Sequence, residues 1–293
     1  MHKSGFVNII GNPNVGKSTL MNALVGEKLS IITSKAQTTR HRIMGIVSGE
    51  DFQIVYSDTP GILKPSYKLQ ESMMKFVTGA VADADVILYV TDTVERGERS
   101  AGIIDRIRQS GVPAIVVINK IDLTTPEALE ALVDKWQGEL PEARIVPASA
   151  KENFNIEGLF KTILALLPEG PAFYPKETLT DKTLRFFASE IIREKILKFY
   201  DKEIPYCCEI EIESYKEEPA IDRIAATIYV ARDSQKGILI GHKGEKLKRV
   251  GQAAREDMEQ FLGKKVFLQL FVKVNDDWRN NERQLRRFGY ESE

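Results

Sequence analysis

An eight-residue loop near the N-terminus has the composition of a phosphate-binding site. Its residues fit the pattern G-x-x-x-x-G-K-[ST], with an apolar run before it (Val7–Ile10) and a helical pattern after it (Lys17–Val25). Glycines let backbone N–H groups surround phosphate oxygens, and the N-terminus of the following helix adds positive potential. We expect Lys17 to reach the β- and γ-phosphates of a nucleotide and Ser18 to bind Mg²⁺. The loop comprises Gly11, Asn12, Pro13, Asn14, Val15, Gly16, Lys17 and Ser18, and Thr19 completes this nucleotide-binding segment.

A second motif, Asn119-Lys120-Ile121-Asp122, predicts which base the nucleotide carries. It follows the apolar run Ala114–Ile118 and so lies at the carboxyl end of a predicted strand, where open α/β sheets bind ligands. The Asp122 carboxylate can accept hydrogen bonds from N1–H and the 2-amino group of guanine. Adenine has no donor at these places and would leave the carboxylate unpaired. The motif therefore favours guanine.

Three residues around the base complete this half of the predicted pocket. We expect Asn119 to connect the chain segments that form the pocket. We expect Lys120 to lie over the base plane and the backbone N–H of Ala150 to reach guanine O6. Ala150 belongs to the downstream motif Ser149-Ala150-Lys151.

Two further segments could sense the γ-phosphate. Asp58-Thr59-Pro60-Gly61 follows the apolar run Phe52–Ser57, so its carboxylate can hold Mg²⁺ through water and its glycine N–H can contact the γ-phosphate. Gln37-Thr38-Thr39-Arg40 lies in a polar stretch that can order when a threonine hydroxyl joins the metal ligands. We favour Thr39 over Thr38, and a solvated loop is the alternative. The candidate catalytic residues are Lys17, Thr39 and Gly61, and the candidate Mg²⁺ ligands are Ser18, Thr39 and Asp58.

The elements that position these motifs alternate along the chain. From Phe6 to about Leu167, short β-branched runs alternate with helical patterns, which predicts an α/β domain with a mainly parallel sheet covered on both faces. Pro168, Gly170, Pro171 and Pro175 then indicate a linker, because proline disfavours both helix and central strand. The predicted strands are Val7–Ile10, Phe52–Ser57, Val86–Thr91, Ala114–Ile118 and Arg144–Pro147. The predicted helices are Lys17–Val25, Leu69–Ala82, Gly97–Ser110, Pro126–Leu140 and Ile156–Leu166.

The pattern after the linker predicts a smaller α+β domain. Cys207 and Cys208 are the only cysteines, and we expect them on opposite faces of a strand, which gives neither a disulfide framework nor metal-ligand spacing. In order, the predicted elements are a helix (Leu184–Tyr200), two strands (Cys207–Ser214 and Ile224–Ala231), two helical stretches flanking Gly241–Gly244, and a strand (Val266–Val274). We therefore divide the chain into a nucleotide-binding domain (1–170), a linker (171–183), the smaller domain (184–275) and a C-terminal helical tail (276–293).

The charge of the chain limits how it could bind nucleic acid. The formal net charge is −1, so such binding would need a local basic patch. The segment from Arg232 to Arg255 contains seven basic residues and only two acidic ones. The tail adds Trp278 among several arginines, where an aromatic ring can stack on bases or pack onto the domain. No apolar stretch approaches the roughly 20 residues needed to span a bilayer, so we expect any membrane contact to be peripheral.

Taken in this order, the motifs resemble those of the translation-factor-related GTPases. Gln37–Arg40 together with Asp58–Gly61 resembles the Era branch, whose members couple a P-loop GTPase domain to a C-terminal KH domain. Ile240-Gly241-His242-Lys243-Gly244 is similar to the KH loop, and the element order is that of the bacterial, type II KH fold. A KH loop clamps about four unpaired nucleotides. The implied RNA-binding residues are Lys236, Gly241, His242, Lys243, Gly244, Lys246, Lys248 and Arg249.

The resemblance also implies partners and a cellular role. These are GTP and GDP, Mg²⁺, the 3′ end of 16S ribosomal RNA during assembly of the 30S subunit, and peripheral association of a cytoplasmic monomer with the inner membrane. Ile62 stands where Ras-like enzymes place a glutamine that orients water, a task an apolar side chain cannot perform. Era-like GTPases share this feature, and in related members the asparagine that corresponds to Asn14 is associated with K⁺. An asparagine that caps its own turn is the alternative.

Two other functions compete with this reading. A signalling or trafficking GTPase would use the second domain to bind protein, although the C-terminus lacks a prenylation cysteine and the Gly241–Gly244 loop favours RNA. A GTP-dependent RNA-modifying enzyme would need a cysteine, zinc or cofactor constellation beside the KH segment, and the sequence offers none.

Overall fold

Six strands form the central sheet of the N-terminal part of the chain in our computed structural model, which describes residues 1–94 and 101–290. Their order is β2-β3-β1-β4-β5-β6, and neighbouring strands are parallel except β2 and β3. The predicted mainly parallel sheet is confirmed. The strands are β1 (Lys3–Gly11), β2 (Ile43–Ser48), β3 (Phe52–Asp58), β4 (Val86–Asp92), β5 (Ala114–Asn119) and β6 (Arg144–Pro147).

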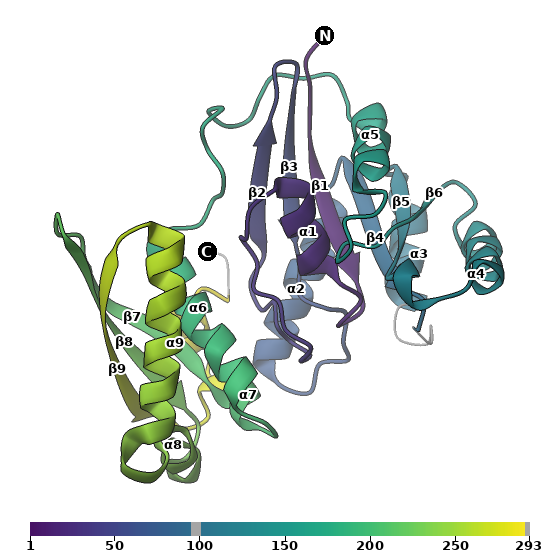
Figure 1. Cartoon of the computed structure of the whole chain (residues 1–293). Coiled ribbons are helices and arrows are strands. Elements are labelled where there is room, and N and C mark those ends of the chain that lie inside the picture. Colours follow the sequence, from purple (N-terminus) through teal and green to yellow (C-terminus); the bar gives the residue numbers. More distant parts are fainter. Residues whose placement is uncertain (95–100, 291–293) are drawn as a thin grey trace. The chain divides into compact units, whose positions relative to one another are not determined.

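Helices cover both faces of this sheet, which explains why its inner strands are nearly continuous runs of β-branched residues (Figure 1). Ile10, Tyr89 and Ile118 pack against Val77 and Trp136 on the face covered by α2, α3 and α4. The other face is covered by α1 and α5. The helices are α1 (Lys17–Val25), α2 (Lys68–Ala82), α3 (Ala101–Ser110), α4 (Pro126–Glu139) and α5 (Ile156–Leu166), with a 3₁₀ turn η1 (Ile121–Leu123).

Two elements of this unit differ from the sequence prediction. Strand β2 was not predicted, because Gly45 interrupts its apolar run and an edge strand is covered less completely than an inner one. The helix predicted from Gly97 is observed from Ala101 onward, and its first four positions lie outside the described residues.

The proline-rich segment after α5 runs along the sheet. The Gln53 side chain bonds to the backbone of Tyr174 in both directions, and the Ile46 N–H donates to Leu179 O at 2.8 Å. The chain divides into two compact units, with the main boundary between Asp181 and Lys182 and with Tyr67–Leu69 grouped with the second unit. Residues 171–181 therefore belong to the first unit. No helix within 1–94 or 101–290 is long and apolar enough to cross a membrane.

The second unit has the helix–strand–strand–helix–helix–strand order that the sequence predicts. Its three-stranded sheet has the order β7-β8-β9, antiparallel between β7 and β8 and parallel between β8 and β9. Short additions to this order are α7 and η2. The elements are α6 (Leu184–Phe199), α7 (Ile204–Cys207), β7 (Glu209–Lys216), β8 (Ile221–Val230), α8 (Asp233–Ile240), η2 (His242–Gly244), α9 (Glu245–Leu262) and β9 (Lys265–Val274).

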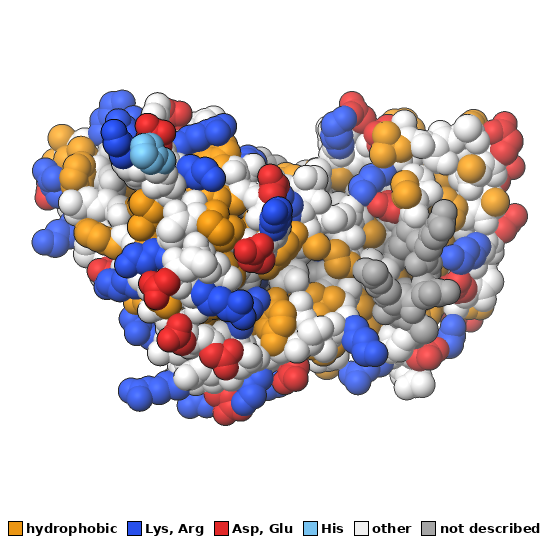
Figure 2. Space-filling model, turned by 90° about the horizontal axis from the view of Figure 1, so that it is seen from below, with side chains coloured by type: hydrophobic (Ala, Val, Ile, Leu, Met, Phe, Trp, Pro, Cys, Tyr) orange, Lys and Arg blue, Asp and Glu red, His pale blue; other side chains and the backbone are white. Residues whose placement is uncertain are grey.

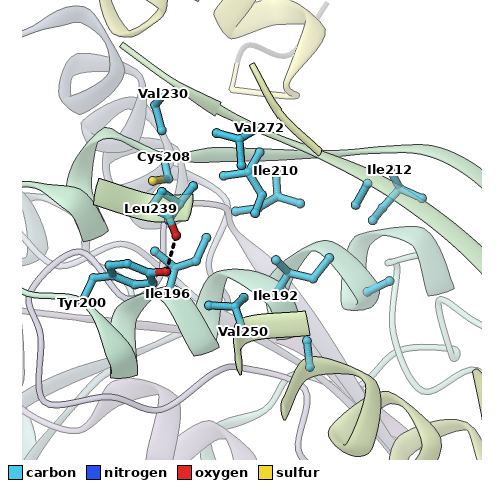
Figure 3. Packing of buried hydrophobic residues seen from close by; sticks show 14 of the residues in the cluster. Ile192, Ile196, Tyr200, Cys208, Ile210, Ile212, Val230, Leu239, Val250 and Val272 are labelled. Carbon is cyan, nitrogen blue, oxygen red and sulfur yellow. Dashed lines mark hydrogen bonds between the residues drawn. The ribbon is translucent and has the colours of Figure 1, made fainter. Parts of the chain in front are cut away.

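The core of this unit lies between its helices and one face of the sheet (Figure 3). Ile196 of α6, Ile210 of β7 and Val250 of α9 meet there. The Tyr200 hydroxyl donates to Leu239 O at 2.6 Å, which ties the end of α6 to α8. This packing holds the loop between α8 and α9 on a rigid base.

The two cysteines do not alternate across a strand, so that prediction was wrong. Cys207 ends the short helix α7, Cys208 precedes β7, and both side chains are buried in the same core. The cause is the turn of helix that begins at Ile204, because both sulfur atoms point back to the Ile204 carbonyl oxygen, at 3.4 and 3.1 Å.

The tail packs onto the second unit through its tryptophan. Trp278 is fully buried, and its Nε1–H donates to Cys207 O at 3.0 Å. Of the two alternatives for this ring, packing is therefore the one observed. The tail contains η3 (Trp278–Asn280) and α10 (Glu282–Arg287).

Candidate nucleotide-binding and RNA-binding sites

The phosphate-binding loop connects β1 to α1 at the carboxyl edge of the sheet. Gly16 has φ of 95°, a left-handed conformation, and a Cβ there would lie 2.2 Å from the Asn119 amide nitrogen. Only glycine fits both demands. The Lys17 ammonium group is buried at the loop and donates to Gly11 O at 3.0 Å and Asn12 O at 2.8 Å.

A cavity of about 460 Å³ opens over this loop. Its walls come from the loop itself, from residues 31–39, from Gly61 and from Lys120. Lys17, Ser18 and Gly61, which the sequence predicts to contact the phosphates or the metal ion, therefore line one cavity. Ile31, Ile32 and Thr33 also line it, and the sequence analysis did not single these out.

Three side chains converge beside this cavity in a way that fits a divalent cation. The Ser18 hydroxyl lies 2.8 Å from Thr39 Oγ1 and donates to Asp58 Oδ2 at 2.7 Å, while Thr39 Oγ1 donates to the same oxygen at 3.1 Å. Thr38 instead bonds to Thr33 and Lys35. The threonine next to Ser18 is therefore Thr39.

The other oxygen of Asp58 strengthens the fit. Oδ1 is buried and has no hydrogen-bond partner among the described residues, which is costly unless a cation or water binds it. Complete burial raises the pKa of this carboxyl, while Lys17 and the hydrogen bonds from Ser18 and Thr39 act to lower it. Hydroxyl and carboxylate oxygens are the ligands that Mg²⁺ prefers.

The residues around Gly61 point mainly to the core. Thr59 is fully buried and its hydroxyl donates to Ile9 O at 2.7 Å, and Pro60 is buried as well. The Ile62 side chain packs in the core with Ile10 and Val77 and does not line the cavity. Its backbone N–H donates to Gly11 O at 3.1 Å, so this segment is pinned to the phosphate-binding loop.

Asn119 joins three segments of the site. Its amide donates to Val15 O at 2.8 Å and its oxygen accepts from the Ala150 N–H at 3.0 Å. The Ala150 N–H, predicted to reach guanine O6, is thus bonded to Asn119 in this structure. Beside it, the Ser149 hydroxyl donates to Asp122 Oδ1 at 2.6 Å and orients that carboxylate. Ile121 is half-buried, and Lys151 is exposed.

Lys120 is held by a residue that the sequence analysis missed. Its ammonium group donates to Asp92 Oδ2 at 2.6 Å and to Asn14 O at 2.5 Å. Asp92 is buried at the carboxyl end of β4 and also accepts from the Val94 N–H at 3.0 Å. The available signal was its position: an aspartate that directly follows a predicted strand lies at the edge where ligands bind.

In the second unit, the basic loop lies between α8 and α9. Gly241 has φ of 75°, which favours glycine, and Lys243 is also left-handed. The His242 and Lys243 side chains between the loop glycines are exposed, as are Lys246, Lys248 and Arg249 on the first turns of α9, while Lys236 is half-buried. Figure 2 shows Lys and Arg side chains gathered on the surface of this unit.

Two of these cations lie over aromatic rings at the end of α6. The Arg249 guanidinium carbon is 4.3 Å from the Phe199 ring centroid, and the Lys246 ammonium group is 5.9 Å from that of Tyr200. Such contacts restrict the side chains before any ligand arrives.

A groove of about 530 Å³ continues from this loop. Gly251 of α9 leaves room beside Leu270 of β9, and Lys248 and Arg255 provide cations along it. An apolar floor with a cationic border can hold bases and neutralise phosphates.

Comparisons with known proteins assign a family to each of the two units. A family model described as 50S ribosome-binding GTPase matches residues 6–120, and a KH domain model matches residues 203–279. GTPase Era of Alkaliphilus metalliredigens (strain QYMF) is 46% identical over 293 residues, with 99% of each chain covered. This chain belongs to the Era family of GTPases.

Other Era proteins show the same relation. GTPase Era of Staphylococcus haemolyticus (strain JCSC1435) is 45% identical and covers 99% of this chain and 97% of its own. A solved Era structure in complex with MgGDPNP and nucleotides 1506–1542 of 16S ribosomal RNA has a TM-score of 0.96 and 41% identity over all of both chains. An Aquifex aeolicus Era variant bound to GDP and AlF4⁻ has a TM-score of 0.95, with 41% identity over 99% of this chain and 100% of its own.

Membership of the Era family carries an activity. The chain hydrolyses GTP to GDP and phosphate, and its fold is a P-loop GTPase domain followed by a KH domain.

Proposed function

We propose that this chain is a GTP-dependent switch that binds the 3′ region of 16S ribosomal RNA through its KH domain and acts in assembly of the 30S subunit. One observation carries the proposal: a single chain holds a cavity over its phosphate-binding loop and, in its second unit, an exposed basic loop that leads into a groove. The RNA bound by the solved relative supports the choice of 16S ribosomal RNA.

Hydrolysis would proceed by in-line attack of water on the γ-phosphate. Lys17 and the N–H groups of the loop from Asn14 to Ser18 would stabilise negative charge that develops on the phosphate oxygens. The Gly61 N–H would contact the γ-phosphate. Mg²⁺, held by Ser18 and Thr39 directly and by Asp58 through water, would supply further charge neutralisation.

The side chain at position 62 would not orient the attacking water, because Ile62 is apolar and packs in the core. The Asn14 side chain lines the cavity and has no hydrogen bond with the described residues, so it does not cap its own turn here. We therefore include K⁺ at Asn14 in the proposal, as the Era resemblance implies.

Guanine would be recognised at the other end of the pocket. Asp122, oriented by Ser149, would accept from N1–H and the 2-amino group, and Lys120 would lie over the base. Asn119 would keep the base segments against the phosphate-binding loop.

The KH domain would hold single-stranded RNA. The backbone of the loop Gly241–Gly244 would approach phosphates closely, with His242 and Lys243 facing them. Lys236, Lys246, Lys248 and Arg249 would neutralise neighbouring phosphates. The Era resemblance also supports a cytoplasmic monomer with peripheral association with the inner membrane.

The test is RNA binding by a variant that reverses charge in the loop. His242→Asp combined with Lys243→Asp places carboxylates at phosphate contact distance, so binding to the 3′ region of 16S ribosomal RNA should be abolished while GTP affinity is unchanged. Filter binding over a series of salt concentrations measures this, because each phosphate contact contributes about −0.7 to the log–log slope for a single strand.

A matched control reverses two exposed cations elsewhere. Lys135→Asp with Lys161→Asp, on α4 and α5, changes the net charge slightly more than the loop variant does, because His242 is counted as neutral, and should leave RNA affinity almost intact. Wild-type RNA affinity and salt slope in the loop variant would overturn the proposed RNA site and favour a protein-binding second domain.

A further inference from the structure

Arg42 lies three residues after Thr39, and its guanidinium group belongs to a polar network that joins β1, β3 and the end of α2. Its Nε–H donates to Ser57 Oγ at 2.6 Å, and its two Nη groups donate to the Asp83 carboxylate at 2.5 and 3.0 Å. One Nη also donates to Asn8 Oδ1 at 3.1 Å. Four hydrogen bonds to three residues fix this guanidinium.

The network reaches the last turn of α2 by two routes. Asp83 is the residue after that helix, and its N–H still donates to Gly79 O. The fully buried Asn8 amide donates to Ala80 O and to Asp83 Oδ1, both at 2.7 Å. A bond from Arg42 to Asn8 or to Asp83 is therefore a bond to the end of α2.

The chain between Thr39 and Arg42 follows the same helix. The His41 ring lies 6.4 Å from the ring of Phe76, which is seven residues, or about two turns, before Asp83 on α2. Ser57, the third partner of Arg42, directly precedes Asp58 on β3. One guanidinium thus connects the chain that follows Thr39 to the residue that precedes Asp58.

We propose that Arg42 is a positioning residue that locks the Thr39 segment to β3 and α2, and so selects GTP over GDP. The inference rests on the proposed role of Thr39 in the nucleotide site. Such a threonine is held in place when the γ-phosphate is present and is released after hydrolysis. Arg42 therefore stabilises the protein with bound GTP, in which Thr39 is held in place. It adds no stability to the protein with bound GDP, in which Thr39 is released.

The experiment compares dissociation constants for GDPNP and GDP, both with Mg²⁺, by calorimetry on the full chain. Arg42→Ala should weaken GDPNP binding about tenfold, as expected for loss of charge-assisted hydrogen bonds, and change GDP binding less than about twofold. Asp83→Ala removes two of the four bonds at a half-exposed side chain and should produce the same selectivity at a smaller magnitude. Arg108→Ala breaks an exposed ion pair with Asp105 on α3 and should change neither constant.

Hydrogen exchange gives a readout independent of affinity. With GDPNP bound at saturation, amides of residues 33–41 should exchange faster in the Arg42→Ala variant than in the wild type, while those of α5 should not change.

The outcomes separate this inference from the proposed function. If Thr39→Ala loses GDPNP affinity but Arg42→Ala and Asp83→Ala retain the wild-type GDPNP/GDP ratio, the inference fails and the switch remains. If Arg42 is only structural, its variants weaken both nucleotides by the same factor, which also overturns the inference. If Arg42→Ala does not fold, the GDPNP/GDP affinity ratio of Asp83→Ala alone tests the inference. If the wild type binds neither nucleotide, the proposed function itself fails.

Discussion

The Asn119 side-chain amide donates a hydrogen bond to the backbone carbonyl oxygen of Val15, which lies 104 residues earlier in the chain, at 2.8 Å. The base-recognition motif and the phosphate-binding loop are thus joined directly, through a side chain that is almost fully buried. A nucleotide that spans both segments meets a pocket whose two halves are already held at a fixed separation, which lowers the ordering cost of binding.

Asn119→Ala should weaken GTP and GDP binding by about tenfold or more and lower the free energy of unfolding by about 1–3 kcal/mol. The reason is that Val15 O and Ala150 N–H would both lose a buried partner. Calorimetry and urea unfolding of the nucleotide-free protein measure the two effects. Gln137→Ala, at an exposed side chain on α4, serves as the control. Full nucleotide affinity in the Asn119 variant would contradict the bridging role.

Asp122→Asn should shift the preference from guanine towards xanthine nucleotides. An amide can donate where xanthine presents an acceptor, whereas the carboxylate accepts from guanine donors. The Ser149 hydroxyl at 2.6 Å from Oδ1 can reorient to pair with either side chain, so the geometry should survive the change. Competition between GTP and xanthosine triphosphate measures the preference. Unchanged selectivity for GTP would remove Asp122 from base recognition.

Asp92→Ala should weaken GTP and GDP equally, by about fivefold, because Lys120 would lose the charge that holds it over the base. Asp105→Ala is the matched control, since it breaks an exposed aspartate–arginine pair on α3. A fluorescent guanine nucleotide titrated into both variants gives the comparison. Should the Asp92 variant match the control, Lys120 would not depend on Asp92 for its position.

The sequence best predicts those functional residues that belong to a motif within one short segment. Gly11–Ser18 could be assigned because its pattern and its flanking strand and helix occupy one short segment. Asp92 and Arg42 could not, because Lys120 is 28 residues from Asp92, the partners of Arg42 are 15 to 41 residues away, and an isolated aspartate or arginine has no local pattern. Only the folded sheet brings these side chains together.

The difference between strong and weak local patterns also explains which elements the sequence predicted wrongly. Inner strands such as β4 and β5 are covered on both faces, so burial makes them visible as apolar runs. The edge strand β2 is only partly covered and contains Gly45, so its signal is weak. At Cys207, the alternating pattern of the following strand was extended too far, because a single helical turn at Ile204–Cys207 is shorter than the period that reveals a helix.

Asn14 offers the sharpest test of the monovalent cation. This residue is left-handed, with φ of 65°, and its backbone oxygen accepts from the Lys120 ammonium group at 2.5 Å, so the loop holds its side chain beside the cavity. If that side chain helps to bind K⁺, GTP hydrolysis should be faster in K⁺ than in Na⁺ at equal ionic strength. Asn14→Ala should remove the difference and leave the rate in Na⁺ unchanged.

The control must separate loss of the cation from damage to the loop. Asn14→Asp keeps an oxygen donor and should retain a faster rate in K⁺, whereas Asn14→Ala should not. GTP affinity of the wild type and of Asn14→Ala, measured in Na⁺, should agree within about a factor of two if the loop is intact. Equal rates of wild-type hydrolysis in the two salts would eliminate K⁺ from the site, and the GTPase would then depend on Lys17, Mg²⁺ and backbone N–H groups to stabilise the charge on the γ-phosphate.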